Sequence, residues 1–292
     1  MKPAPFAYVQ AESIEHAVQA LSKAGGDGKI IAGGQSLMPM MNFRLVKPAV
    51  LVDINRIPGL DSLTCEADRI RIGALVRHRM TATDPLIAEH LPVVHHAMKH
   101  VAHLTVRNRG TFCGSVCHAD PAAEMPMLAL LLNGTAEAVS VRGSRSLSMQ
   151  DFFVGALATS LAADELVTAI EIDRLRPGTG WGFEEFARRH GDYALVAVAV
   201  TVERRQDRAA AVRIGAIGVG ELPARVGNVE TLLEDSDMGA AALTEAVDLL
   251  QASISPGSDL NASADYRRHL AGVLLRRAMT DAWARARELG PI

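Results

Sequence analysis

The sequence predicts an α+β protein of two or three lobes, and three observations support this prediction. A length of 292 residues exceeds what one compact core usually serves. Hydrophobic residues make up 49% of the chain, which is enough apolar surface for more than one core. In the last third, strand-like segments are grouped before helical ones, as in a separate α+β lobe. We place the lobes at residues 1–56, 57–175 and 177–292.

The first lobe begins with a predicted helix over Ser13 to Ala24. Its apolar residues repeat on one face, and Ser13 is a residue type suited to N-capping. Glycines end the helix, and the apolar run 29–32 predicts a buried strand. A short helical turn over 38–45 and a strand over 50–54 follow, and Pro58-Gly59 predicts the turn that separates this lobe from the next.

The second and third lobes are divided by a predicted linker, Arg176-Pro177-Gly178. Apolar spacing before this linker predicts strands at 69–75, 136–142 and 165–172, one long helix over 84–103 and a strongly apolar helix over 122–132. After it, the pattern predicts three strands, at 181–189, 195–203 and 211–218, and then helices at 228–233, 240–253 and 264–289.

Charge and cysteine content limit the classes of partner and the compartment. The 30 basic and 33 acidic side chains leave a net charge of −3, which gives no electrostatic reason to expect nucleic acid. Three cysteines, Cys65, Cys113 and Cys117, are an odd number and too few to cross-link a chain of this length, so we expect a reducing, cytoplasmic location. No run approaches the ~20 apolar residues needed to cross a bilayer, so we expect no transmembrane segment.

Two glycine-centred stretches carry the chemical information. The first glycine segment is residues 32–37, Ala-Gly-Gly-Gln-Ser-Leu, and the second is residues 111–115, Thr-Phe-Cys-Gly-Ser. Backbone without Cβ atoms can bring several N–H groups onto one oxyanion cluster, and Ser36, Thr111 and Ser115 add hydroxyl donors. The pattern predicts a pyrophosphate site. Lys29 either neutralises charge there or is a solvated lysine at a strand start.

Other nucleotide and metal sites fit the sequence less well. Neither the G-x-G-x-x-G spacing of a dinucleotide-binding fold nor the G-x-x-x-x-G-K-[ST] phosphate loop is present. Cys113 and Cys117 with His118 lack the second paired half of a zinc site. His96, His100 and His103 fall at i, i+4 and i+7, which predicts a polar helix face. We therefore expect no metal in this chain.

Four stretches taken together resemble the FAD-binding medium subunits of the molybdenum-containing hydroxylases, the family that includes carbon monoxide dehydrogenase and xanthine dehydrogenase. They are residues 32–37, Arg107-Asn108-Arg109-Gly110-Thr111, Gly114-Ser115 and Ala119-Asp120-Pro121-Ala122-Ala123-Glu124. The resemblance covers essentially the whole chain. It implies a two-part FAD-binding domain of the vanillyl-alcohol-oxidase (PCMH) type, followed by a C-terminal α+β domain with a three-stranded sheet and helices.

The resemblance also implies which residues meet FAD. The two glycine segments would enclose the pyrophosphate from both sides, with Glu124 in the acidic position associated with the nucleotide. Val101 and Val167 stand where the family has apolar contacts to FAD. Tyr193, in the polar turn 188–194, matches an aromatic residue near the isoalloxazine ring. The full set is Lys29, Ile30, Ile31, Ala32, Gly33, Gly34, Gln35, Ser36, Leu37, Val101, Thr111, Cys113, Gly114, Ser115, Asp120, Glu124, Val167 and Tyr193.

Two positions depart from the family pattern. Cys113 stands where the family usually has glycine, so a Cβ must fit there. A glycine-only backbone would be strained by ~1–3 kcal/mol, whereas at an ordinary φ the thiol fills space, and we favour the second interpretation. Glu184 or Glu185 stands where relatives often carry lysine, which implies that one basic flavin contact is missing.

The resemblance implies an oxidoreductase subunit with noncovalent FAD and no catalytic residue of its own. Electrons would come from [2Fe–2S] clusters of a small subunit, which about eight thiolates would hold, and organic substrate would be oxidised on a large subunit with a molybdenum cofactor. The expected assembly is a dimer of heterotrimers that passes electrons to an external acceptor. Two alternatives stay open: a self-sufficient flavin oxidase of the same fold, and a nucleotide-binding scaffold protein.

Overall fold

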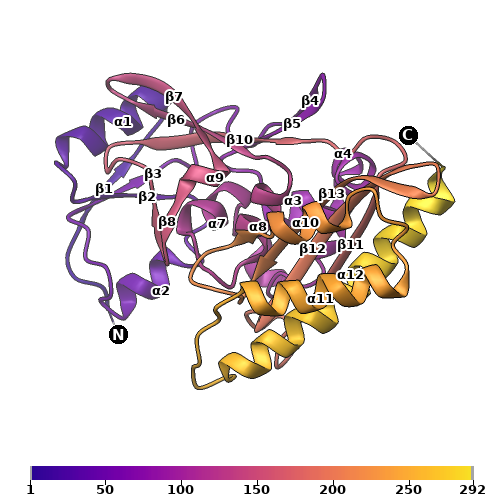
Figure 1. The fold of residues 1–292 in the computed structure, drawn as a ribbon. Helices are drawn as coiled ribbons and strands as arrows, with labels where there is room; N and C mark the ends of the chain where they lie inside the picture. The colour runs from indigo at the N-terminus through magenta and orange to yellow at the C-terminus, as the bar shows by residue number, and fades with distance from the viewer. Residues whose placement is uncertain (1, 291–292) are drawn as a thin grey trace.

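The computed structural model describes residues 2–290, which form three larger sheets, a two-stranded ribbon and surrounding helices (Figure 1). The larger sheets follow one another along the chain, with strands in residues 7–53, 63–173 and 180–225. In Figure 1 the indigo N-terminal lobe and the yellow C-terminal helix lie at opposite ends of the molecule. The second lobe contacts the first lobe and the sheet of the third.

The first lobe is a three-stranded parallel sheet with the order β1-β3-β2. Its strands are β1 (Ala7–Gln10), β2 (Gly28–Ile31) and β3 (Val50–Asp53), of which the sequence prediction missed β1. Helix α1 (Ile14–Lys23) is capped by Ser13, whose Oγ accepts from the N–H of His16 at 3.0 Å, as predicted. Because the strands are parallel, β2 and β3 end at the same sheet edge, where the first glycine segment begins. Helix α2 (Leu37–Asn42) follows that segment.

The second lobe is a five-stranded antiparallel sheet with the order β4-β5-β10-β6-β7. The central strand β10 is buried along most of its length, and it was predicted within one residue at each end. Between the β6–β7 hairpin and β10, the chain forms the short helix α9 and a two-stranded ribbon of β8 and β9. The bounds are β4 (Leu63–Glu66), β5 (Arg69–Gly73), β6 (Thr135–Ser140), β7 (Gly143–Ser148), α9 (Met149–Phe152), β8 (Phe153–Gly155), β9 (Ala158–Thr159) and β10 (Leu166–Asp173).

The long helix predicted over 84–103 is wrong. The chain instead forms α4 (Pro85–His90) and α5 (Pro92–Ala97), each of which begins with proline. Proline lacks the N–H that a continuing helix needs and fits the first helical turn, so each one starts a new helix. The remaining helices of this lobe are α3 (His78–Thr83), α6 (Leu104–Arg107), α7 (Phe112–His118) and α8 (Glu124–Leu131).

The third lobe has four strands, not the three predicted, in the order β11-β12-β13-β14. The additional strand, β14 (Ala224–Arg225), has two residues and pairs with the end of β13. A strand of two residues is too short for apolar alternation to reveal it. The other elements are β11 (Gly180–Phe186), β12 (Val196–Arg205), β13 (Arg208–Ile217), α10 (Gly227–Leu233), α11 (Ala240–Ser253) and α12 (Ala264–Leu289). The predicted helices correspond to α10, α11 and α12.

Strand β12 shows how the second and third lobes join. Its valines, beginning at Val196, belong to the core beneath α11 and α12, whereas Ala197 and Ala199 belong to the core shared with the second lobe. Helix α8 of the second lobe packs on this alanine face, and α12 packs on β11 and β12. Small alanine side chains allow the close approach of α8. The third lobe is therefore packed closely against the second.

Candidate functional site

The two glycine segments, far apart in the sequence, lie close together. A Cβ on Gly33 would lie 2.3 Å from the carbonyl oxygen of Arg109 and 2.8 Å from the Cα of Gly110, so only glycine fits there. The next residue, Gly34, has a φ of +70°, a left-handed conformation that favours glycine. The structure thus requires both glycines. Gly33 allows the backbone of Arg109 and Gly110 to come close, and Gly34 adopts the left-handed backbone angle.

The second glycine segment is the start of helix α7 and not a loop. Thr111 is the N-cap, and its hydroxyl accepts a hydrogen bond from the N–H of Gly114 at 3.0 Å. A Cβ on Gly114 would lie 2.5 Å from that hydroxyl oxygen, so a larger residue would disturb the cap. Gly114 is exposed and Ser115 is half-buried, while Thr111 and Phe112 are buried. Gly114 and Ser115 are therefore the residues of this segment that a ligand can reach.

Cys113 lies in the first turn of α7 with its side chain in the core. The residue is 2% exposed, and its thiol lies 3.3 Å from the carbonyl oxygen of Ile72. It is absent from the residues with positive φ, which confirms that the thiol fills space at an ordinary backbone angle. Burial raises the pKa of this thiol well above its usual value. Any contact of Cys113 with a ligand would have to come from its backbone.

Acidic side chains and Tyr193 gather where α8 begins. The carboxylate of Asp120 accepts from the N–H of Ala122 at 2.9 Å, and Glu124 is buried in the first turn of α8. Burial raises the pKa of Glu124 to about 7, with a further contribution from the charge of Asp120. Tyr193 remains 64% exposed, and burial of part of its ring, together with both carboxylates, raises its pKa. The structure therefore brings these three predicted residues together.

Glu185 joins this acidic group from β11. Its side chain is only 3% exposed, and one carboxylate oxygen is buried without a hydrogen-bond partner. Burial, and secondarily the charge of Glu124, raise the pKa of Glu185 to about 8. The Nδ1 of His100 lies 4.0 Å from the other carboxylate oxygen, and burial lowers the pKa of that imidazole. Of the two glutamates that the sequence left open, Glu185 is the one that faces the acidic group.

The turn that carries Tyr193 is held against the second lobe. Gly191 has a φ of +85°, and a Cβ there would lie 2.6 Å from the imidazole of His103. The turn between β11 and β12 therefore lies directly on the residue that precedes α6. This contact fixes the turn two residues before Tyr193, whose side chain stays largely exposed.

The remaining predicted residues lie in or beside these elements. Lys29 is exposed on β2, with no hydrogen bond or ion pair of its side chain among residues 2–290, and Ile30 and Ile31 complete the strand. Gln35 is exposed and donates to the carbonyl oxygen of Gly33 at 3.2 Å. Ala32, Ser36 and Leu37 are half-buried around it. Val101 and Val167 are 7% and 5% exposed in the core of the second lobe.

The three histidines do not share one helix face, which corrects that prediction. Helix α5 ends at Ala97, so His96 lies in it, His100 follows it and His103 precedes α6. The rings of His96 and His100 pack with Trp181 and Phe183. Within the described part of the chain, no three histidine, cysteine, aspartate or glutamate side chains converge in a way that would hold a metal ion.

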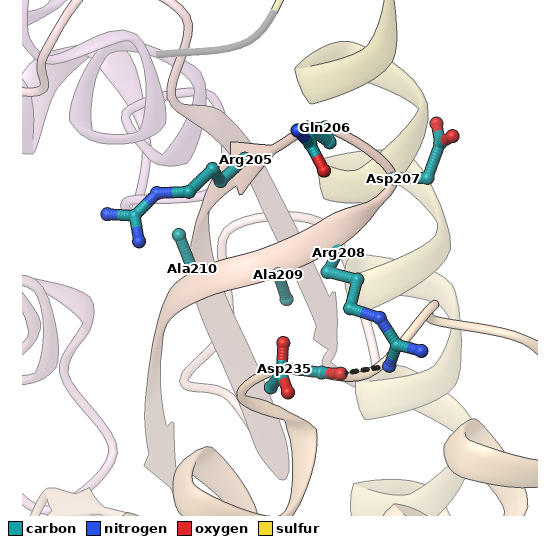
Figure 2. Close-up of a pocket in the computed structure, with 7 residues that line it drawn as sticks. All are labelled: Arg205, Gln206, Asp207, Arg208, Ala209, Ala210 and Asp235. Carbon is teal, nitrogen blue, oxygen red and sulfur yellow. Dashed lines mark hydrogen bonds between the residues drawn. The ribbon is translucent and has the colours of Figure 1, made fainter.

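Two surface pockets lie away from the glycine segments. One, of about 270 Å³, lies at the tip of the β12–β13 hairpin, where Arg208 donates to the carbonyl oxygen of Asp235 (Figure 2). The other, of about 320 Å³, lies where the second lobe meets the third, and ion pairs such as Arg174–Asp68 and Arg213–Asp173 line it. The arginines of this second pocket are paired with carboxylates, so it is a polar junction between lobes rather than an anion site. Between residues 2 and 290, no helix combines the length and apolar character needed to cross a membrane.

The site geometry fits a bound dinucleotide such as FAD. Gly33 lets the first segment pack against the backbone of Arg109 and Gly110, and Ser36, at the N-cap of α2, makes no capping hydrogen bond with its hydroxyl. Gly114 and Ser115 are accessible at the start of α7. Backbone N–H groups and hydroxyls of this kind are the donors that a pyrophosphate requires.

Comparison with known proteins agrees over the whole chain. Residues 4–174 match the family described as the FAD binding domain in molybdopterin dehydrogenase, and residues 181–282 match the CO dehydrogenase flavoprotein C-terminal domain. The chain is 43% identical to the nicotine 6-hydroxylase medium subunit of Paenarthrobacter nicotinovorans, over 98% of this chain and all of that one.

Solved structures give the same result. Carbon monoxide dehydrogenase from Hydrogenophaga pseudoflava, in a form lacking the Mo-pyranopterin moiety of its molybdenum cofactor, contains a chain that matches with a TM-score of 0.95 at 33% identity, covering 98% of this chain and 99% of that one. Quinoline 2-oxidoreductase from Pseudomonas putida 86 contains one that matches with a TM-score of 0.93 at 37% identity and the same coverage. The chain therefore belongs to the family of FAD-binding medium subunits of the molybdenum hydroxylases.

Proposed function

We propose that this chain is the electron-transferring FAD subunit of a heterotrimeric molybdenum hydroxylase or dehydrogenase in the cytoplasm. It would accept electrons from the [2Fe–2S] clusters of a small subunit and deliver them to an external acceptor. The large subunit would carry the molybdenum cofactor and oxidise the organic substrate, and two heterotrimers would pair. The observation that carries the proposal is the full-length match to medium subunits, joined to two glycine segments that lie side by side.

Within this proposal the chain itself binds and positions the flavin. FAD supplies the redox chemistry when it is bound. The glycine segments would hold its pyrophosphate, and Tyr193 would cover the ring from the acidic side of the site. The three cysteines cannot supply the about eight thiolates of two [2Fe–2S] centres, and the thiol of Cys113 is buried in the core, which supports a separate iron–sulfur subunit.

Flavin content tests the binding half of this proposal. The purified chain should carry one noncovalent FAD, which acid precipitation releases. Covalent flavin would favour a self-sufficient oxidase, and a folded chain without reducible flavin would favour a scaffold protein.

Gly34→Glu should remove the flavin, because a carboxylate in the segment repels the pyrophosphate where about 2 kcal/mol or more of charge-assisted hydrogen bonding is expected. Gly34→Ala is the matched control, since it meets the same strain at a φ of +70° without the charge. Equal flavin loss in both variants would assign the effect to backbone strain, and full retention in Gly34→Glu would contradict the site.

A further inference from the structure

A chain of hydrogen bonds crosses from the first lobe to the second beside the glycine segments. Asn55, just after β3, donates from its side-chain amide to the carbonyl oxygen of Ala32 at 2.9 Å. Ala32 opens the first glycine segment. The same amide donates to the carboxylate of Asp53 at 2.6 Å, and this carboxylate also accepts from the backbone N–H of Asn55 and from the hydroxyl of Tyr8. The amide of Asn55 is therefore fixed in orientation from the side of the first lobe.

Arg77 completes the connection from the second lobe. One end of its guanidinium donates to the side-chain oxygen of Asn55 at 2.6 Å, and the other donates to the carbonyl oxygen of Arg109. Its backbone pairs with Thr111, the N-cap of α7. The guanidinium of Arg77 thus links Asn55, which holds the first glycine segment, to the stretch around Arg109 that leads into the second segment.

The carbonyl oxygen of Arg109 is also the atom against which Gly33 lies. A Cβ on Gly33 would come within 2.3 Å of it, so the backbone of the first segment contacts the stretch that leads into the second at this point. Because Arg77 bonds to this oxygen and Asn55 bonds to the carbonyl just before Gly33, the two side chains hold both sides of the contact. A shift of either side chain would change the distance between the segments.

We propose that Asn55 and Arg77 are positioning residues that set the spacing of the two glycine segments, and that they act on FAD only through those segments. The inference rests on the proposed function for its ligand, because it concerns the same flavin site. Each terminal nitrogen of the guanidinium already donates to a protein oxygen, and we assign the contacts with the pyrophosphate to the two segments rather than to Arg77.

Arg77→Lys is the informative variant. Lysine keeps the charge and the apolar stem, but its single ammonium does not reproduce the fork that reaches two acceptors. We expect the Kd for FAD to rise about tenfold or more, while the urea midpoint of the flavin-free chain stays close to wild type. Arg79→Lys is the matched control, because Arg79 is exposed on α3, the helix that Arg77 precedes, and its guanidinium makes no hydrogen bond or ion pair within residues 2–290.

Two further measurements separate positioning from direct contact. The salt dependence of the Kd should be the same for the neutral variant Arg77→Gln as for wild type, since a residue that does not touch the phosphates contributes no screened ion pair. The double variant Asn55→Ala with Arg77→Lys should weaken FAD binding by less than the product of the two single effects, because both act through one network. An Arg77→Lys Kd within twofold of wild type, or independent effects of the two residues, would overturn the inference.

Hydrogen exchange of the flavin-free chain gives a readout that does not depend on FAD. In Arg77→Lys, amide exchange should accelerate in residues 32–37 and 110–115 and stay unchanged in α12, which lies in another lobe. Unchanged exchange in both segments would refute the inference. A wild-type chain that bound no flavin would refute the proposed function instead, and the exchange experiment would still decide whether Asn55 and Arg77 fix the spacing.

Discussion

At the scale of single residues, Cys113 shows how a substitution in a binding motif can be absorbed. The family usually has glycine at this position, beside the expected phosphate site. Because the segment is the first turn of α7, the Cβ of Cys113 points inward and its thiol reaches the carbonyl of Ile72. The accessible positions of the turn are Gly114 and Ser115.

Replacing Cys113 therefore tests the core rather than the flavin. Cys113→Gly should lower the free energy of unfolding by about 1–3 kcal/mol, because it removes a buried side chain and places glycine in a helix. The Kd for FAD should not change. Urea unfolding of the flavin-free chain and a flavin titration measure the two effects. A tighter or a much weaker Kd with unchanged stability would show that the thiol faces the ligand.

The buried titratable residues make the stability of the flavin-free chain depend on pH. Glu124 and Glu185 have pKa values raised in the folded chain from 4.5 to about 7 and about 8, so the stability they contribute is fully present below pH 4.5 and is lost between that pH and those folded values. The effect of His78 on stability has the opposite pH dependence. Burial lowers its pKa from 6.5 to about 4, so the stability it contributes is lost as pH falls through that range. The charge of Arg107 lowers it further.

Glu185→Gln should flatten the fall in stability with rising pH. The amide is isosteric and has no charge to bury, so the flavin-free variant should lose less stability than wild type between about pH 5 and pH 8. Urea unfolding at a series of pH values measures the effect, and the contribution of His78 should be unchanged because that residue is intact. If the stability of wild type and of Glu185→Gln changed with pH in the same way, a group other than Glu185 would be responsible for the loss.

At the scale of elements, helix α12 lies on the third-lobe sheet with almost no space between them. A Cβ on Gly180 or Gly182 of β11 would lie 2.0 Å from a carbonyl oxygen of α12, that of Ala282 or Ala278 respectively. Main-chain atoms of a packed helix do not move aside as a flexible side chain does.

Gly182→Ala should therefore cost about 2–4 kcal/mol of unfolding free energy, as the overpacking of a core does. Gly220→Ala is the matched control, since a Cβ there meets nothing within 4 Å. It should be neutral or slightly stabilising. Urea unfolding of both variants decides the matter, and equal stabilities would show that α12 can shift away from β11.

Sequence reasoning succeeded where apolar periodicity is long and failed where a few local residues decide. The long strands β10 and β12 and the helices α1, α11 and α12 follow from their patterns. The break at Pro92 and the start of α7 at Thr111 depend on one proline and one capping hydroxyl, which periodicity does not weigh. The link through Asn55 and Arg77 joins two lobes, so no local pattern could show it. Its one sequence signal is a polar Asp53-x-Asn55 at the end of a buried strand.

At the scale of the whole molecule, the lobes meet around the candidate site. The first lobe supplies the first glycine segment, the second supplies α7 and α8, and the third supplies Tyr193 and Glu185. Helix α8 begins at Glu124 in the site and continues beneath the third-lobe sheet. One packed body therefore carries both halves of the proposed flavin site and the residues proposed to face the ring.

The most direct test of the account is stopped-flow absorbance of the flavin in reconstituted mixtures. If this chain relays electrons, its flavin should bleach rapidly with organic substrate only when the large molybdenum subunit and the small iron–sulfur subunit are both present. The chain alone should be reduced by a strong chemical reductant, and with the large subunit but no small subunit its flavin should stay oxidised on the turnover timescale. Rapid substrate-dependent bleaching of the isolated chain, or of the pair without iron–sulfur clusters, would contradict the account.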